Sequence, residues 1–259
     1  MSAVEIVGRG FLARHLSALA GAHEDVTVLA AGVSSTAVAS PDALAREAAL
    51  VRDTARRCGA EGRTLVFLST ASQALYGTCD TPAGEESAAP VTPYGRHKLD
   101  LERRLAQDLA DSDASWLVLR LSHVVGSHQR PHQLLPALVA QIASGEVRVF
   151  AGAHRDLVDV ADVVACLDAL LASGTRREVL NVAAGTPYAV EDIVRGVERQ
   201  LGRTARWDVV DAGDRGGRTT VRVDRLRHHV GDHAPAGGPA YLERLLVRYT
   251  ASYRPAALV

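Results

Sequence analysis

Short apolar runs alternate with segments of helical character along the first half of the chain, and this alternation limits the possible folds more than any other feature. The runs predicted to form buried strands span residues 4–7, 26–31, 64–68 and 116–121. The predicted helices span about 11–19, 41–58 and a segment that begins at Tyr94. Strands that alternate with helices build a parallel, doubly wound sheet. The sequence therefore predicts an α/β protein.

The pattern after Gly126 is looser and indicates a smaller second unit. Helices are predicted over 135–142, 159–171, 190–201 and 241–249, and strands over 147–150, 179–182 and 205–210. Residues 76–93 and 211–218 are rich in turn-forming residues and are predicted to be loops. Because no repeat or hinge-like linker separates the two parts, we expect a small C-terminal lobe on the main sheet.

Composition and charge narrow the class of partner. The formal net charge is -1 and no basic run occurs, so nothing favours nucleic acid or an anionic membrane as a partner. No apolar stretch is long enough to span a bilayer, and the first residues lack the layout of a signal peptide. The three cysteines, Cys58, Cys79 and Cys166, form no C-x-x-C pair, so we expect no disulfide framework and a cytoplasmic location.

Lys98 is the single lysine of the chain. Lysine and arginine together number 29, and all the others are arginine. A guanidinium is planar and always charged, whereas an ammonium is a compact point charge. A position that keeps lysine in so arginine-rich a chain is predicted to need an ammonium, and the alternative is chance survival of one surface lysine.

A glycine pair follows the first predicted strand. Gly8 and Gly10 stand between this strand and a helix, where backbone N–H groups and the positive helix end can bind a pyrophosphate. Ala13 takes the small position needed for close packing of helix on strand. The pattern is weak by itself, and an ordinary turn is the alternative.

Tyr94 and Lys98 are four residues apart and therefore share one face of a helix. A nearby ammonium favours the phenolate and lowers the pKa of a tyrosine from its ordinary value of roughly 10. Such a tyrosine can exchange a proton with a carbonyl or carbinol oxygen while hydride moves to or from a nicotinamide. An upstream hydroxyl, from Ser72 or Thr70, can hydrogen-bond the same oxygen. A helix-start tyrosine with a solvated lysine is the alternative, and the single lysine argues against it.

Seven short segments, in order over nearly the whole chain, together resemble one protein family. They are residues 8–13, 28–32, 69–77, 92–98, 119–126, 155–163 and 181–185. The segments TPYGRHK, which contains Tyr94, and RDLVDVADV, which begins at Arg155, match the family most closely. The chain resembles the extended short-chain dehydrogenases, the NAD-dependent epimerase/dehydratase family that acts on nucleotide sugars.

The resemblance implies a Rossmann-like doubly wound sheet and two functional parts. Residues 1–125, completed by 157–185, are expected to form the nucleotide-binding domain, and 126–156 with 186–259 the substrate-binding lobe. We expect NAD or NADP as cofactor and a nucleotide sugar or another glycosyl compound as substrate. The reaction expected is that of a reductase or of an epimerase/dehydratase at a sugar carbonyl or carbinol.

The resemblance also implies roles for individual residues. Tyr94 is expected to be the acid–base group, with Lys98 holding the nicotinamide ribose, and Ser72 is preferred over Thr70 as the catalytic hydroxyl. The residues expected to contact the cofactor are Gly8, Arg9, Gly10, Phe11, Leu12, Ala30, Ala31, Lys98 and Leu121. Those expected to contact the substrate are His123, Gln133 and Arg155, the last through a phosphate.

One part of the family's fold is expected to be missing. The first helix is followed at once by residues 26–31, which resemble the family's fourth strand, so the second and third strands have no counterpart. Those strands normally hold the adenosine, including an acidic residue on its ribose. Arg9 then either binds a pyrophosphate or 2′-phosphate or is a solvated loop residue. The competing hypothesis is a non-redox enzyme or a binding protein on a truncated fold that has lost the dinucleotide.

The sequence predicts no metal site, and the family resemblance predicts a dimer. The histidines that lie close in sequence lack a zinc-like spacing: His123, His128 and His132. Asp159 and Asp162 are expected at a helix N-terminus and not as an acid–base pair. By analogy with the family we expect a homodimer, in which the helices that begin at Pro41 and Tyr94 pack against their mates.

Overall fold

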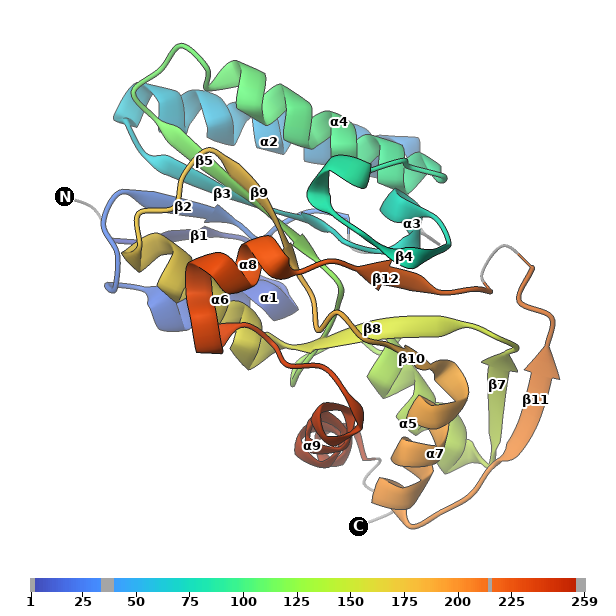
Figure 1. Ribbon diagram of the computed structural model, residues 1–259. Coiled ribbons are helices and arrows are strands. Elements are labelled where there is room, and N and C mark those ends of the chain that lie inside the picture. The colour runs from blue at the N-terminus through green and yellow to red at the C-terminus, as the bar shows by residue number, and fades with distance from the viewer. Residues whose placement is uncertain (1–2, 34–39, 214–215, 255–259) are drawn as a thin grey trace.

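A five-stranded parallel sheet forms the centre of the computed structural model, which describes residues 3–33, 40–213 and 216–254 (Figure 1). In spatial order its strands are β1 (Glu5–Val7), β2 (Val26–Leu29), β3 (Thr64–Thr70), β5 (Ser115–Leu121) and β9 (Glu178–Val182). Every residue of β2 and β3 is buried, as expected of strands covered on both faces. The predicted α/β class and parallel sheet are confirmed.

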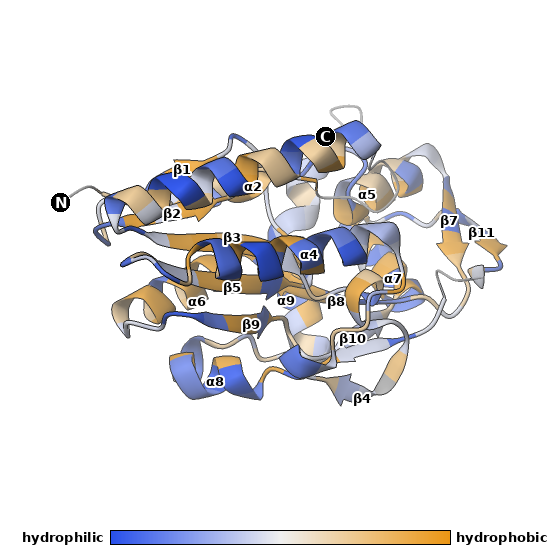
Figure 2. Ribbon diagram, turned by 90° about the horizontal axis from the view of Figure 1, so that it is seen from above, coloured by the Kyte–Doolittle hydropathy of each residue, from blue (hydrophilic) through white to orange (hydrophobic). Residues whose placement is uncertain are grey.

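Helices cover both faces of this sheet, which makes it doubly wound. On one face lie α2 (Pro41–Glu61) and α4 (Pro93–Asp108); on the other lie α1 (Phe11–Leu16), α6 (Val160–Ala172) and α8 (Asp224–Val230) (Figure 1). Figure 2 shows β2, β3 and β5 as largely hydrophobic, whereas α2 and α4 alternate between polar and apolar residues. Within the described ranges, each helix is too short or too polar to span a bilayer.

Caps in the sequence determine where the two long helices begin. The Ser40 hydroxyl accepts a hydrogen bond from the backbone N–H of Ala43 at 3.2 Å, immediately before α2. The Thr92 hydroxyl accepts one from Gly95 at 3.0 Å, immediately before α4. In both helices proline takes the first position, where its missing N–H is tolerated. The cap at Thr92 places Tyr94 in the first turn of α4.

The C-terminal lobe combines small sheets with three helices. Its strands are β6 (His123–Val125), β8 (His154–Asp159) and β10 (Pro187–Ala189) in one sheet, and β7 (Glu146–Phe150) with β11 (Arg206–Val210) in another. Its helices α5 (Leu134–Ser144), α7 (Val190–Leu201) and α9 (Pro239–Thr250) pack around one apolar cluster. Asp159 caps α6 by accepting from Ala161 at 2.8 Å, which confirms its predicted place at a helix N-terminus.

The loop prediction for residues 76–93 is wrong. That segment contains β4 (Cys79–Ala83) and a 3-10 turn at Glu85–Ser87, and it follows the short helix α3 (Gln73–Tyr76). β4 pairs with β12 (Thr219–Val221), which lies far downstream in the sequence. No local periodicity marks a strand whose partner is so remote and whose sequence contains a proline.

The sheet ends at β1, as the direct passage from the first helix to residues 26–31 predicts. β1 pairs with β2 on one side, and among the described residues no strand pairs with its other edge. From α1 the chain continues through a 3-10 turn at Ser17–Leu19 into β2. The sheet is therefore truncated beside its first strand.

Candidate active site

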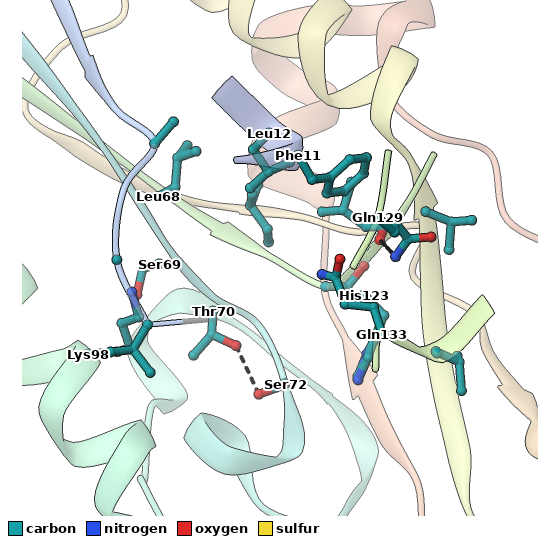
Figure 3. A pocket seen from close by; sticks show the side chains of 18 of the residues that line it. Phe11, Leu12, Leu68, Ser69, Thr70, Ser72, Lys98, His123, Gln129 and Gln133 are labelled. Carbon is teal, nitrogen blue, oxygen red and sulfur yellow. Dashed lines mark hydrogen bonds between the residues drawn. The ribbon is translucent and has the colours of Figure 1, made fainter. Parts of the chain in front are cut away.

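A cavity of about 420 Å³ opens at the carboxyl ends of β2, β3 and β5, where the lobe meets the sheet (Figure 3). Open α/β sheets bind their ligands at this edge. The predicted site residues that line it are Phe11, Leu12, Ala30, Ala31, Thr70, Ser72, Tyr94, Lys98, Leu121, His123, Gln133 and Arg155. Gly8, Arg9 and Gly10 do not line it, and the Arg9 side chain is exposed. The structure thus brings together all the predicted residues except the glycine loop.

Three hydroxyl groups meet in this cavity. Thr70 ends β3, and its Oγ1 donates a hydrogen bond to Ser72 Oγ at 2.9 Å (Figure 3). Tyr94, which is 9% exposed at the start of α4, lines the same cavity. Both candidates for the catalytic hydroxyl therefore share a cavity with the tyrosine, and the preference for Ser72 stays a prediction.

Two contacts fix α4 against its neighbours α3 and β5. A Cβ at Gly95 would lie 1.9 Å from the carbonyl oxygen of Ala74, so the glycine lets α4 pack directly on the backbone of α3. Farther along α4, Glu102 accepts a hydrogen bond of 2.6 Å from Arg120 Nη2, a buried cation of β5. These contacts hold the face of α4 that carries the tyrosine and the lysine.

Lys98 is buried and paired with a carboxylate that the sequence analysis did not identify. Its Nζ donates to Glu47 Oε1 at 2.7 Å, and Glu47 Oε2 lies 3.0 Å from His97 Nε2. Glu47 belongs to α2 and is 3% exposed. Lys98 Nζ also lies 5.8 Å from the centre of the Tyr94 ring. The only sequence signal for Glu47 is an acidic residue on the otherwise buried face of α2.

The environment of Tyr94 opposes the phenolate. Burial raises the pKa of Tyr94, and the negative charge of Glu47 raises it further, while the hydrogen bond with Thr70 lowers it. The pKa of Tyr94 is therefore raised overall, whereas the sequence predicted that it would be lowered. Lys98 is one member of an ion pair, and the other member, Glu47, lies on a different helix and is not apparent from the spacing of Tyr94 and Lys98.

The glycine loop at Gly8 and Gly10 exposes backbone for a phosphate, but the helix that follows it is short. A Cβ at Gly8 would lie 2.7 Å from the carbonyl oxygen of Ala30, so the loop packs closely on the end of β2. A Cβ at Gly10 would meet no atom within 4 Å, so bare backbone at the start of α1 faces open space. Because α1 has only six residues, the positive charge at its N-terminus is small.

The lobe side of the cavity carries neutral and cationic donors. Burial, and then the neighbouring Arg155 charge, lower the pKa of His123 to about 3, so its imidazole is neutral near pH 7. Gln133 Oε1 accepts from the backbone N–H of Arg130 at 2.7 Å, which fixes this amide at the wall. Among the described residues, no group of three or more His, Cys, Asp or Glu side chains is placed to hold a metal ion.

A second cavity, of about 960 Å³, adjoins the first and shares Ser72, His123 and Arg155 with it. Its wall includes Asp156, which the sequence analysis did not single out. Asp156 Oδ1 accepts from the backbone N–H of Ala184 at 2.9 Å, and burial raises the pKa of Asp156 to about 6. The two cavities together provide room for a ligand that extends between sheet and lobe.

Comparison with protein families agrees with this geometry. A sequence model of the NAD dependent epimerase/dehydratase family matches residues 16–183, more than half of the chain. The chain belongs to the NAD dependent epimerase/dehydratase family, and the resemblance inferred from its motifs is confirmed. The match includes Tyr94 and Lys98 but begins downstream of Gly8 and Gly10.

Two curated relatives are sugar-nucleotide enzymes. The dTDP-6-deoxy-L-talose 4-dehydrogenase (NAD(P)(+)) of Kitasatospora kifunensis is 31% identical over 162 residues, which cover 58% of this chain and 50% of that protein. The UDP-glucose 4-epimerase of Bacillus subtilis (strain 168) is 31% identical over 178 residues, which cover 58% and 51%. The chain thus spans about half the length of the curated relatives it matches.

The fold also has close counterparts among solved structures. RMD from Pseudomonas aeruginosa, solved in complex with NADPH, has a TM-score of 0.83 at 20% identity, over 98% of this chain and 99% of that one. At this identity the likeness concerns the fold, and it confirms the Rossmann-like architecture.

Proposed function

We propose that this chain transfers hydride between NAD or NADP and a carbonyl or carbinol carbon of a nucleotide-linked sugar. One observation carries the proposal: Tyr94, Lys98 and the hydroxyls of Thr70 and Ser72 line one cavity at the carboxyl edge of the sheet. Membership of an NAD-dependent family supports it, as do the sugar-nucleotide activities named for the two relatives.

The cavity suits the nicotinamide half of a dinucleotide, which when bound supplies or accepts the hydride. Leu29, Ala30, Leu68 and Leu121 give it an apolar wall for a flat ring. Lys98 Nζ provides a donor for ribose hydroxyls. The open backbone at Gly10, which lies outside the lining of the cavity, is proposed to contact a phosphate.

Tyr94 exchanges the proton that accompanies hydride transfer. Because burial and Glu47 raise its pKa, the phenol is protonated near pH 7 and donates to a substrate carbonyl oxygen in the direction of reduction. Thr70 and Ser72 orient that oxygen by hydrogen bonding. Glu47 holds the Lys98 ammonium in place and offsets its charge.

The adjoining cavity is proposed to bind the rest of the substrate. Arg155 lines both cavities, and a guanidinium binds phosphate oxygens in a fixed geometry. The neutral His123 beside it adds a hydrogen-bonding group without a second positive charge. These two residues support a phosphate-bearing substrate.

Titration with NADH and NADPH, followed by nicotinamide fluorescence, tests the redox proposal. We expect saturable binding of at least one of them below about 1 mM, the upper range of ordinary enzyme affinities. Absence of binding of both at millimolar concentration would exclude the redox function.

A second candidate, a non-redox enzyme or binding protein in the same pocket, is favoured by one observation, the termination of the sheet at β1. Substitution of Lys98 by Ala separates the two functions. We expect Lys98→Ala to abolish hydride transfer, whereas retained biological activity in this variant would favour the non-redox function.

We further propose a cytoplasmic homodimer that associates through α2 and α4, which lie together on one face of the sheet (Figure 1). Light scattering at micromolar protein concentration is expected to give the mass of a dimer, and a monomer mass would refute this proposal.

A further inference from the structure

Among the described residues, the sheet has strands on only one side of β1. Sheets that bind dinucleotides consist of two mononucleotide-binding halves on either side of the first strand. Here β2, β3, β5 and β9 all follow on one side of β1, and no described strand pairs with its other edge. The chain passes from α1 through Ser17–Leu19 directly into β2.

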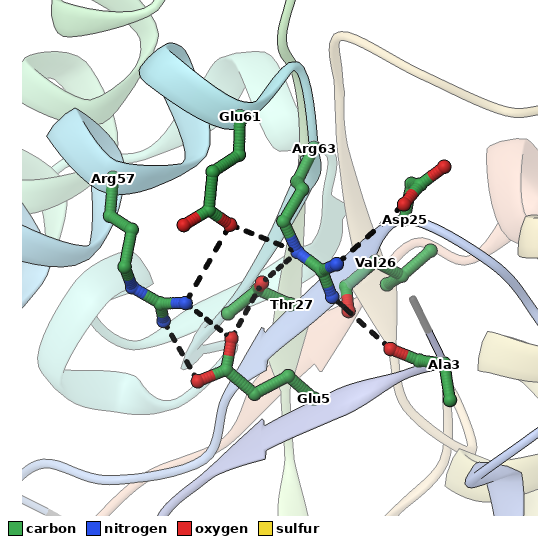
Figure 4. Close-up of polar contacts among 8 residues, drawn as sticks. All are labelled: Ala3, Glu5, Asp25, Val26, Thr27, Arg57, Glu61 and Arg63. Carbon is green, nitrogen blue, oxygen red and sulfur yellow. Dashed lines mark hydrogen bonds and ion pairs between the residues drawn. The ribbon is translucent and has the colours of Figure 1, made fainter. Parts of the chain in front are cut away.

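Polar contacts join β1 to β2 and to α2 (Figure 4). Arg57 of α2 donates two hydrogen bonds to Glu5 of β1, at 2.7 and 2.9 Å. Arg63 Nη2 donates to the carbonyl oxygens of Ala3 at 3.2 Å and Val26 at 2.6 Å. These contacts hold β1 on β2, and β1 is the last strand of the sheet among the described residues.

Among the described residues, the walls of the 420 Å³ cavity lie in the lobe or on the side of β1 where the other strands follow. Its lining comes from the ends of β2, β3 and β5, from α4, from the first residues of α1 and from the lobe. Gly8 and Arg9, at the open edge, are not part of this lining. A nicotinamide and its ribose bound in this cavity would be surrounded by described side chains, whereas none of the described lining lies at the open edge of β1.

We propose that this site recognises the nicotinamide mononucleotide half of its cofactor and gains little affinity from the adenosine half. The inference rests on the proposed function. Reduced nicotinamide mononucleotide is therefore expected to bind nearly as tightly as NADH. Discrimination between NADH and NADPH is expected to be weak as well, because the 2′-phosphate belongs to the adenosine half.

Fluorescence titrations of the full chain with reduced nicotinamide mononucleotide, NADH and NADPH test this inference. The three dissociation constants are expected to agree within about tenfold. Ala31→Leu adds bulk to the shared cavity wall and is expected to weaken binding of mononucleotide and dinucleotide by the same factor. Arg9→Ala, and Arg14→Ala as an exposed control on α1, are expected to leave the ratio of the two affinities unchanged.

Binding of NADH roughly 100-fold tighter than of the mononucleotide would overturn the inference and leave the proposed function standing. A selective loss of NADH affinity in Arg9→Ala would overturn it in the same way, because it would show that this arginine holds the second nucleotide. Failure of all three compounds to bind at millimolar concentration would overturn both the inference and the proposed function.

Discussion

Replacement of Glu47 by Gln removes one charge beside Lys98 and keeps the shape of the side chain. Lys98 Nζ lies 5.8 Å from the centre of the Tyr94 ring, and charges at that distance attract by about 3 kcal/mol at an effective dielectric constant of about 20. Glu47 Oε1, which is 2.7 Å from Nζ, can lie no farther than about 8.5 Å from the ring centre, so its repulsion of a phenolate is at least about 2 kcal/mol. The ion pair therefore stabilises the phenolate by about 1 kcal/mol at most.

Without Glu47 the full attraction of Lys98 acts on Tyr94. Since about 1.4 kcal/mol corresponds to one pH unit, we expect the ionisation of Tyr94 in Glu47→Gln to move to lower pH by roughly 1.5 units. The phenolate absorbance, measured against pH as the difference between Glu47→Gln and the double variant Glu47→Gln/Tyr94→Phe, isolates this one tyrosine. The same difference between the parent chain and Tyr94→Phe gives the reference.

Asp53→Asn is the matched control, because Asp53 lies on the same helix, carries the same charge and has a side chain that is 68% exposed. It is expected to leave the ionisation of Tyr94 unchanged. Circular dichroism must show that Glu47→Gln remains folded, since an unpaired buried ammonium costs stability. An ionisation of Tyr94 at the same pH in parent and Glu47→Gln chains would refute the assignment of Glu47 as the group that offsets Lys98.

Three further predictions follow from other residues of the site. Tyr94→Phe is expected to lower kcat of hydride transfer by about 10²–10⁴-fold with little change in nicotinamide binding, and an unchanged kcat would exclude Tyr94 as the acid. Burial raises the pKa of Asp156 to about 6, so its ionisation between about pH 4 and pH 6 lowers the stability of the parent fold by up to about 3 kcal/mol. The free energy of unfolding of Asp156→Asn should therefore rise relative to that of the parent as pH rises through this interval. A constant difference between the two in denaturant melts would contradict this. Gly95→Ala is expected to lower the free energy of unfolding by about 1–3 kcal/mol, since its Cβ would lie 1.9 Å from a carbonyl oxygen. Gly59→Ala, whose Cβ would lie 3.6 Å from its nearest atom, should be neutral or stabilising. Equal melting temperatures for the two variants would be inconsistent with this packing.

The sequence predicted those parts of the fold that local periodicity determines. The strands of the main sheet were predictable because each contains a short run of mostly apolar residues, and the truncation at β1 followed from the short interval between α1 and β2. β4 and β12 escaped prediction because they pair only with each other, across most of the chain. α8 was also not predicted; it is a short helix that ends in charged residues and histidines, and its apolar signal is limited to Leu226 and Val230, which pack beside β9.

The residues of the site also fall into those that local sequence predicts and those that depend on how the helices pack. Tyr94, Lys98, Thr70 and Ser72 were predictable because helix spacing and strand ends place them within short segments of sequence. Glu47 was not, because its contact with Lys98 depends on how α2 packs against α4. The sequence therefore predicted which of these residues meet in the cavity but the wrong direction for the pKa of Tyr94.

Deuterium transfer tests the central claim most directly. The chain is incubated with nicotinamide cofactor deuterated at the transferable position and with a series of nucleotide-linked keto sugars, and the sugar products are examined by mass spectrometry. Our account predicts deuterium in a sugar product of the parent chain and of Asp53→Asn, and at least about a hundredfold less in Tyr94→Phe. Equal incorporation by the parent chain and Tyr94→Phe, or none by the parent with any of these sugars, would contradict it.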